Sequence, residues 1–301
     1  MGTRNKPQDS VQDKRRKISR ANPAGGYLAP NSVEAKPLSL IDVRAMRARS
    51  EPIAMLTCYD ASFAQLLDRC GVDMLLIGDS LGNVIQGHTS TAGVTLDEML
   101  YHTAAVARGT RRGIVVTDLP WNSYHRTIEQ ACDSAARAMA AGAKMVKLEG
   151  GAWLAPTVRF LTERGIPVCA HLGLLPQTAA ATGGYRVQGR EPSAADEIVR
   201  TAVELVEAGA ASVLLEMVPS SLGKRVTQAI TVPTIGIGAG PDTSGQVLVL
   251  YDVLDVFPGR KARFVKNYMA GAGNIDQAVR DYVGEVKARR YPAPEHCYPD
   301  E

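Results

Sequence analysis

One unit recurs three times in this sequence: a helix end closed by glycine, a short apolar run, and an acidic residue where the run stops. Apolar runs of this length, without polar alternation, are typical of strands buried on both faces of a parallel sheet. Parallel strands end at the same edge of a sheet, so we expect the three acids to converge at one mouth. The three copies are Cys70–Asp79, Ala141–Glu149 and Ala208–Glu216.

Strand patterns alternate with helix patterns from about residue 38 onward, which predicts an α/β fold. Seven or eight β/α units favour a closed (β/α)8 barrel of the TIM type. The alternative is an open doubly wound sheet, in which the first and last strands do not pair. The eighth strand is ambiguous: residues 246–256 fit a short helix or a strand, and residues 263–268 compete for the same role.

The first 37 residues differ in composition from the rest of the chain. Residues 1–40 hold eight Lys or Arg against three Asp or Glu, and the segment is rich in Pro, Gly, Asn and Ser. Such a segment buries too little apolar surface to offset its ordering entropy, so we predict a disordered basic tail over residues 1–37. Residues 38–301 then form a single barrel domain. Its slightly acidic balance makes a nucleic-acid partner unexpected.

The five cysteines are odd in number, scattered, and never spaced as C-x-x-C. This usage suits a reducing compartment rather than a disulfide scaffold. There is no apolar run of 18 residues and no apolar core of a signal peptide in the basic N-terminal segment. We therefore expect a cytoplasmic protein with no membrane partner.

Polar residues follow five successive predicted strands at the point where each strand ends. Four carboxylates in one mouth repel one another unless a cation lies among them or some are protonated. Oxygen donors without thiolates or a His pair favour Mg²⁺, held by one or two carboxylates and several waters. A single acid could equally cap a helix or pair with an Arg, but five polar ends in succession argue against that reading. They are Asp79-Ser80, Asp118, Glu149, His171 and Glu216.

Lys147 lies two residues before Glu149, so both side chains point to the same side of their strand. The barrel interior thus receives a lysine, which could act as a Schiff-base nucleophile or as a fixed cation for a substrate carboxylate. Neighbouring carboxylates keep a lysine protonated, which favours the second role.

Three further features are less specific. The Gly-rich segment 173–189 is too long for a plain connector and is a candidate functional loop. The turn Gly236-Ile-Gly-Ala-Gly240 lacks the dinucleotide spacing and fits phosphate binding and tight turning about equally. Trp121 and Tyr124 could line the pocket, although ordinary packing is an equally good reading.

Many blocks in one order resemble the ketopantoate hydroxymethyltransferase family, from about Pro52 to His296. Any one block alone would be a weak signal, but together they are specific. The blocks are Tyr59-Asp-Ala-Ser-Phe-Ala64, Gly78-Asp-Ser-Leu-Gly82, Gln86-Gly-His88, Tyr101-His-Thr-Ala-Ala-Val106, Asp118-Leu-Pro120, Val146-Lys-Leu-Glu-Gly-Gly151, His171-Leu-Gly173, Gly183-Gly-Tyr-Arg-Val-Gln-Gly189, Leu215-Glu-Met-Val-Pro219 and Gly236-Ile-Gly-Ala-Gly240.

The resemblance implies a (β/α)8 barrel, assembled as a homodecamer, that requires Mg²⁺. The implied reaction transfers a hydroxymethyl group from the co-substrate 5,10-methylenetetrahydrofolate to the 2-oxoacid 2-oxoisovalerate (3-methyl-2-oxobutanoate). It gives 2-dehydropantoate for pantothenate biosynthesis through a metal-stabilised enolate.

The resemblance also implies roles for the residues at the strand ends. Asp79, Asp118 and Glu149 would form the metal site. Asp79 and Asp118 would be the metal ligands and would also contact the oxoacid. Ser80 and Lys147 would hold the oxoacid, His171 would hydrogen-bond in the pocket or shuttle a proton, and Glu216 would be the general base.

The sequence departs from the family pattern at a few positions, which include Trp121, Ala92-Gly93, Leu175 and residues 179–182. The charged positions are intact. Three other readings remain: a barrel of the phosphoenolpyruvate mutase and isocitrate lyase kind, a class I aldolase acting through Lys147, and a barrel that serves only as a binding or assembly subunit. The first should carry a catalytic Cys loop, which is not found.

Overall fold

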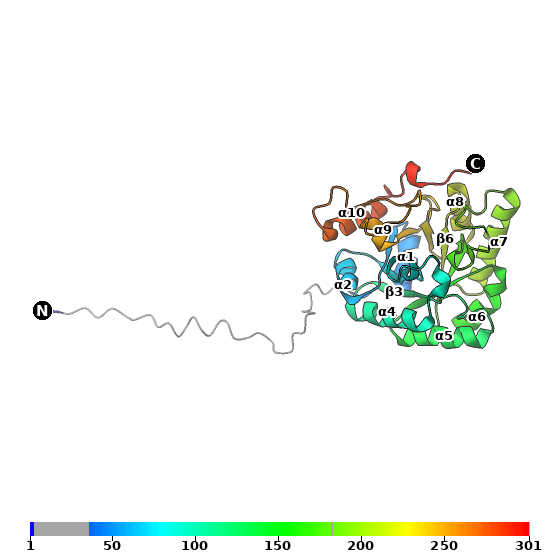
Figure 1. Ribbon diagram of the computed structural model, residues 1–301, viewed down its shortest axis with the longest axis horizontal. Coiled ribbons are helices and arrows are strands. Elements are labelled where there is room, and N and C mark those ends of the chain that lie inside the picture. Colours follow the sequence, from blue (N-terminus) through cyan, green and yellow to red (C-terminus); the bar gives the residue numbers. More distant parts are fainter. Residues whose placement is uncertain (3–35, 182, 301) are drawn as a thin grey trace. The chain divides into compact units, whose positions relative to one another are not determined.

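The computed structural model describes residues 1–2, 36–181 and 183–300 (Figure 1). Most of the predicted disordered tail, residues 1–37, therefore lies outside the described residues. Among the described residues, the first helix, α1 (Leu40–Ala48), begins directly after the N-cap Ser39. The Oγ of Ser39 accepts the backbone N–H of Asp42, whose carboxylate accepts the N–H of Ser39 in return.

Eight parallel strands form a closed barrel in sequence order, which confirms the predicted fold class and rejects the open sheet. The strands are short, as the apolar runs predict, and all but the ends of β5 and β6 are fully buried. They are β1 (Ile53–Thr57), β2 (Met74–Ile77), β3 (Ile114–Asp118), β4 (Met145–Glu149), β5 (Val168–Gly173), β6 (Ser212–Glu216), β7 (Thr234–Ile237) and β8 (Gly245–Leu248).

The eighth strand resolves the ambiguity at the C-terminal part of the barrel. β8 is followed at once by the short helix α9 (Leu250–Val253), so the pattern over residues 246–256 contains a strand and a helix in succession. Residues 263–268 form no strand, and that alternative is wrong. The barrel closes where Ile53 of β1 pairs with Gly245 of β8, and a Cβ at Gly245 would overlap the carbonyl oxygen of Ile53.

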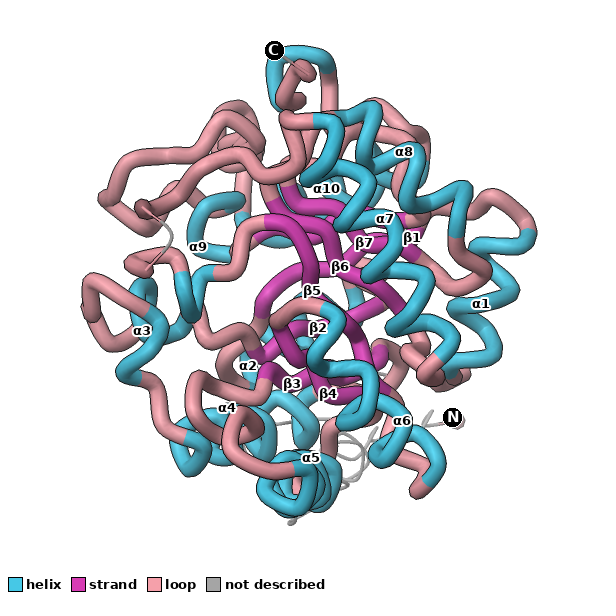
Figure 2. Tube along the Cα trace, turned by 90° about the vertical axis from the view of Figure 1, so that its right-hand side faces the viewer, coloured by secondary structure: helices cyan, strands magenta, loops and turns pink. Residues whose placement is uncertain are grey.

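Helices surround the barrel, as Figure 2 shows. A capping box forms at Thr95 and Glu98, which bond to each other's backbone N–H groups. Thr127 likewise accepts the backbone N–H of Gln130, but the Gln130 side chain accepts from the N–H of Arg126 instead of Thr127. The longer helices are α2 (Ala61–Arg69), α4 (Leu96–Gly109), α5 (Ile128–Ala140), α6 (Ala155–Glu163), α7 (Pro192–Glu207), α8 (Ser220–Ala229) and α10 (Ile275–Lys287). None of the described helices is long and apolar enough to cross a membrane.

The two faces of β4 have different surroundings, as the side-chain alternation predicts. Val146 and Leu148 are buried in an apolar cluster with residues of the surrounding helices, such as Val158 of α6. Lys147 and Glu149 point to the opposite side and are 5% and 3% exposed. The strand therefore delivers two charged groups into the barrel at its carboxyl end, where charge is costly unless it is paired.

Candidate active site

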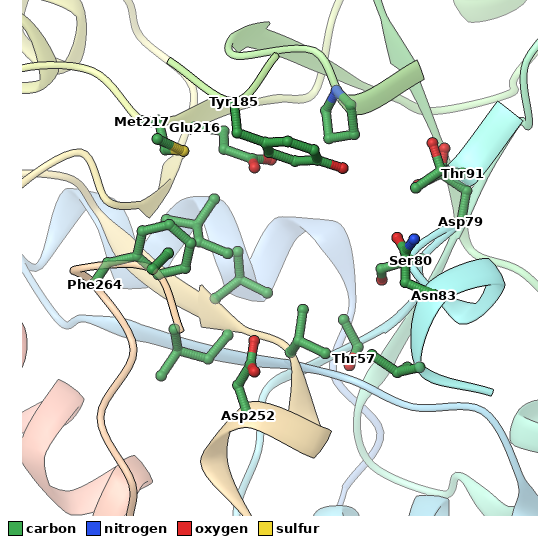
Figure 3. Close-up of a pocket in the computed structure, with 18 of the residues that line it drawn as sticks. Thr57, Asp79, Ser80, Asn83, Thr91, Tyr185, Glu216, Met217, Asp252 and Phe264 are labelled. Atoms are coloured by element: carbon green, nitrogen blue, oxygen red, sulfur yellow. The ribbon is translucent and has the colours of Figure 1, made fainter. Parts of the chain in front are cut away.

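A cavity of about 690 Å³ opens at the carboxyl ends of the strands. This is the end at which barrel enzymes carry their active sites. The structure brings six of the seven predicted site residues to its wall, while Glu149 lies behind it. Figure 3 shows Asp79 and Ser80 on one side of the cavity and Glu216 on another, with the Tyr185 ring beside Glu216. The lining members of the predicted set are Asp79, Ser80, Asp118, Lys147, His171 and Glu216.

Asp79 and Asp118 lie next to each other at the ends of β2 and β3. The backbone N–H of Asp79 donates to Asp118 Oδ2 over 3.1 Å. Burial, reinforced by the charges of Asp118 and Glu149, raises the pKa of the Asp79 carboxyl well above its ordinary value. Two adjacent buried carboxylates are costly unless a cation or a proton joins them.

Lys147 lies between the carboxylates and the imidazole of His171. Its Nζ is 3.0 Å from Asp118 Oδ1 and 3.1 Å from His171 Nδ1. Burial by itself lowers the pKa of Lys147, but the charges of Asp118, Glu149 and Asp79 outweigh that effect and raise it. The ammonium group is therefore a fixed cation at the floor of the cavity.

His171 connects Lys147 to Glu216. Its Nε2 is 3.3 Å from Glu216 Oε2, and its Nδ1 is also 3.1 Å from Glu149 Oε2. Burial and then the charge of Lys147 lower the pKa of His171, so the ring is neutral. Because the ammonium of Lys147 can only donate, we assign Nδ1 as the acceptor and the ring proton to Nε2, which faces Glu216.

Glu149 is held by residues of the loop after β5 and of the segment after β3. Its Oε1 accepts the backbone N–H of Gln177 over 2.6 Å. The Tyr124 hydroxyl is 2.8 Å from the Glu149 carbonyl oxygen and 2.9 Å from Gln177 Oε1. The Nε2 of Gln177 donates to Asp79 Oδ2 and to the carbonyl oxygen of Leu119, over 2.9 and 3.0 Å. Gln177 thus joins Glu149 and Asp79 from behind the cavity wall.

The sequence did not single out Gln177, although it lies in the Gly-rich segment predicted to be a functional loop. Tyr124 proves to be a buried partner of Glu149 and not a lining residue, and Trp121 is 47% exposed outside the cavity lining. The hydroxyls of Ser80 and Tyr59 are 2.9 Å apart, which fixes the Ser80 side chain at the cavity edge. The sequence feature that could have indicated these supporting residues is Tyr124, which is buried beside the strand-end acid Glu149.

The side chains fit a cation that is bound by few protein ligands. Among the described residues, buried atoms without a hydrogen bond include Asp118 Oδ1, Glu149 Oε2 and His171 Nε2, all at this site. No group of three His, Cys, Asp or Glu in the described ranges converges as a cage for a metal. Mg²⁺ is usually bound by one or two carboxylates with waters and substrate oxygens, so Asp79 and Asp118 suffice chemically. The predicted participation of Glu149 stays a prediction.

The turn after β7 has a packing explanation. Gly238 and Gly240 adopt φ of +63° and +79°. A Cβ at Gly240 would come within 2.6 Å of the Ser220 side chain, and one at Gly238 within 2.7 Å of the Phe264 ring. Left-handed backbone and close approach both require glycine here.

The comparisons with known proteins agree with this geometry. Residues 38–294 match the family model described as ketopantoate hydroxymethyltransferase. A protein of Azoarcus sp. (strain BH72) called 3-methyl-2-oxobutanoate hydroxymethyltransferase is 60% identical over 264 residues, which cover 87% of this chain and 97% of the relative. The 3-methyl-2-oxobutanoate hydroxymethyltransferase 1 of Burkholderia cenocepacia (strain HI2424) is 56% identical over 272 residues, or 90% and 99% of the two chains.

Solved structures share the fold at low sequence identity. A phosphonomutase described as putative, from Burkholderia cenocepacia J2315, superposes with a TM-score of 0.55 at 17% identity, over 72% of this chain and 95% of that one. A 2,3-dimethylmalate lyase of the PEP mutase/isocitrate lyase superfamily gives a TM-score of 0.53 at 15% identity, over 84% and 100%.

Proposed function

Because this chain belongs to the ketopantoate hydroxymethyltransferase family, we propose that it transfers a hydroxymethyl group from 5,10-methylenetetrahydrofolate to 3-methyl-2-oxobutanoate, giving 2-dehydropantoate for pantothenate biosynthesis. The observation that carries the proposal is the continuous chain of contacts from Asp118 through Lys147 and His171 to Glu216. It supports the proposal because a carboxylate that could act as base and a lysine ammonium line the same cavity.

The oxoacid binds at the end of the cavity that carries the strand-end acids and Lys147. Lys147 is the buried cation at this end of the cavity and would meet the oxygens of the substrate, and the Ser80 hydroxyl, held by Tyr59, would be a hydrogen-bond partner at the cavity edge. A protonated lysine stabilises negative charge that develops on a substrate oxygen when the C3 proton leaves. Because it is buried and already paired, Lys147 needs little reorganisation to do so.

Glu216 is the base that removes the C3 proton. Its side chain is 14% exposed at the cavity, and one oxygen faces His171 Nε2. A neutral imidazole with its proton on Nε2 faces that oxygen across 3.3 Å, where it can donate once the carboxylate turns slightly toward it. His171 in turn is oriented by Lys147, so the base is positioned through two side chains.

Mg²⁺ fits the pair Asp79 and Asp118, and one observation in its favour is that buried Asp118 Oδ1 meets no hydrogen-bond criterion, although it lies 3.0 Å from Lys147 Nζ. When bound, it would supply a Lewis acid for the carboxylate and ketone oxygens of the oxoacid. Gln177 and the backbone N–H of Asp79 fix the orientation of these two carboxylates.

The overall reaction balances with one water. The C3–H bond of the oxoacid breaks, and C3 forms a bond to the methylene carbon of the folate. Both methylene C–N bonds break, and water supplies the hydroxyl group. The second water proton and the C3 proton account for the two hydrogens gained by the folate nitrogens. Among the residues of this chain, Glu216 is the one that removes the C3 proton.

The test follows the C3 proton of 3-methyl-2-oxobutanoate by NMR in D₂O, with Mg²⁺ and without folate. Wild-type protein is expected to exchange this proton, and Glu216→Gln to reduce the rate by at least about 100-fold. Glu204→Gln is a matched control, because this exposed glutamate lies on α7 and not at the cavity.

Exchange that persists in Glu216→Gln would assign the base to another residue, with His171 next. A wild-type protein that binds Mg²⁺ but shows neither exchange nor transfer when folate is added would overturn the proposed reaction.

A further inference from the structure

The cavity is larger than the oxoacid needs. At about 30 Å³ for each water-sized group, a small oxoacid, a metal ion and its waters occupy on the order of 300 Å³, whereas the cavity measures about 690 Å³. The remaining part, here called the distal lobe, lies on the side of the cavity away from Asp79 and Ser80. Its lining includes Ile237, Val247, Val249, Asp252, Phe257, Arg260, Lys261, Arg263 and Phe264.

Apolar side chains and two aromatic rings form one part of the wall of the distal lobe. Phe264 and Ile237 are only 7% and 8% exposed, and Phe257 is half-buried. Figure 3 shows Phe264 and Met217 on the side of the cavity opposite Asp79 and Ser80. Such walls favour the faces of a flat ring system.

Asp252 is a carboxylate in this lobe for which the proposed reaction has no use. It lies on α9, and Figure 3 shows it pointing into the cavity from the side opposite Glu216. Its Oδ1 is 3.2 Å from Lys261 Nζ, while no described residue hydrogen-bonds to its Oδ2. Burial, partly offset by Lys261, raises the pKa of the Asp252 carboxyl.

Lys261 does not fully neutralise Asp252, because it has other partners. Its Nζ donates to the carbonyl oxygen of Phe257 over 2.6 Å and lies 3.6 Å from Asp255 Oδ1. One ammonium is thus shared between two carboxylates and a carbonyl group. The second carboxylate oxygen of Asp252 faces the cavity and is open to a hydrogen-bond donor of a ligand.

The ring of a reduced folate has the complementary chemistry. Its faces are flat and largely apolar, and one edge carries an exocyclic amino group beside a ring N–H. Two adjacent donors match the two oxygens of one carboxylate, which is the geometry of a strong bidentate contact. The tail of the molecule bears carboxylates, and Arg260 is exposed at the rim of the same lobe.

We propose that the distal lobe binds the pterin ring of the folate co-substrate, with the Asp252 carboxylate accepting from its amino edge and Arg260 facing its glutamate tail. This inference rests on the proposed function. It places the ring between Phe264 and α9, and directs the transferred carbon toward the Glu216 end of the cavity.

The experiment compares Asp252→Asn with Asp255→Asn in the full chain. Both substitutions remove a negative charge beside Lys261, but Asp255 does not line the cavity. Asn at position 252 presents a donor to the pterin donors, so the KM for methylenetetrahydrofolate should rise about 10- to 100-fold. Asp255→Asn should change it by less than twofold. Asp252→Glu, which keeps the carboxylate, should recover part of the loss.

Direct binding of tetrahydrofolate, measured by calorimetry on each variant, gives the same comparison without turnover. Arg260→Gln should weaken the triglutamate form more than the monoglutamate form. Equal folate KM and affinity in Asp252→Asn and wild type would overturn the inference, and so would equal losses in the two Asn variants. Failure of the proposed function is distinct: it would appear in the wild type as absent transfer and absent C3 exchange.

Discussion

The side-chain amide of Gln177 donates a 2.9 Å hydrogen bond to Asp79 Oδ2, although 98 residues separate the two. The same residue donates its backbone N–H to Glu149. Groups that hold a metal-binding or catalytic carboxylate from behind fix its orientation and basicity. Gln177 is therefore a positioning residue, and its effect should be visible in metal affinity as well as in rate.

We predict that Gln177→Ala lowers the Mg²⁺ affinity and the C3 exchange rate each by about 10- to 100-fold. Gln188→Ala, in the same loop, is the control, because the Gln188 side chain hydrogen-bonds to the carbonyl oxygen of Arg186 and, among the described residues, to none of the strand-end acids. Calorimetric Mg²⁺ titration of both variants measures the first effect. A loss of stability in Gln177→Ala without any loss of Mg²⁺ affinity would show that the residue serves the fold alone.

The pKa of Glu149 predicts an unusual pH dependence of stability in the metal-free protein. Burial raises this pKa from 4.5 to about 7 in the folded state. The folded state therefore binds the proton more tightly than the unfolded state does. Its stabilising contribution is complete below about pH 4.5 and is lost as pH rises through about 7.

With a chelator present, we expect Tm to fall by about 5 °C between pH 5 and 7.5, and Glu149→Gln to flatten that slope. His171, whose pKa is lowered by burial, acts in the opposite direction below about pH 6.5, and Asp79, whose pKa is raised, acts in the same direction as Glu149. The difference between the wild type and Glu149→Gln in a calorimetric pH series therefore isolates the contribution of Glu149. Parallel curves of Tm against pH for the two proteins would contradict the assignment.

Gly173 provides a test of how the end of β6 is positioned. It has φ of +92°, and a Cβ added there would overlap the carbonyl oxygen of Glu216. Gly165 has φ of +77° with no atom within 4 Å of its added Cβ. Both Ala substitutions place a side chain on left-handed backbone, which is unfavourable. Only Gly173→Ala also forces β5 and β6 apart.

We therefore expect Gly173→Ala to lower the free energy of unfolding by about 1–3 kcal/mol more than Gly165→Ala does. Urea denaturation of the two variants measures the difference, and the C3 exchange rate reports whether Glu216 has moved. Equal destabilisation would mean that the ends of the two strands adjust freely around the extra methyl group.

The parts of this molecule that sequence predicts are those fixed by local pattern. A buried run that ends in an acid locates a strand and its tip together, so Asp79, Glu149 and Glu216 were placed correctly at one end of the barrel. The contact between Gln177 and Asp79 depends on the path of a long loop, which no periodicity specifies. β8 was ambiguous because a four-residue strand runs almost directly into α9, and neither element is long enough to show its own period.

Lys147 distinguishes the proposed reaction from an aldolase that forms a Schiff base. A Schiff base requires the neutral amine, and the carboxylates around Lys147 outweigh burial and raise its pKa. We predict that borohydride with 3-methyl-2-oxobutanoate leaves the mass of the protein unchanged between pH 7 and 9. Lys147→Met should nevertheless slow C3 exchange by at least about 100-fold, because the cation that stabilises the developing charge is lost.

Lys144→Met is the control for that loss, since Lys144 is exposed three residues earlier on the same chain segment. Peptide mass mapping after reduction checks the first part, and NMR in D₂O checks the second. An adduct on the peptide that contains Lys147 would replace the role of fixed cation with that of nucleophile. Unchanged exchange in Lys147→Met would reject both roles, because each requires the ammonium or amine at the floor of the cavity.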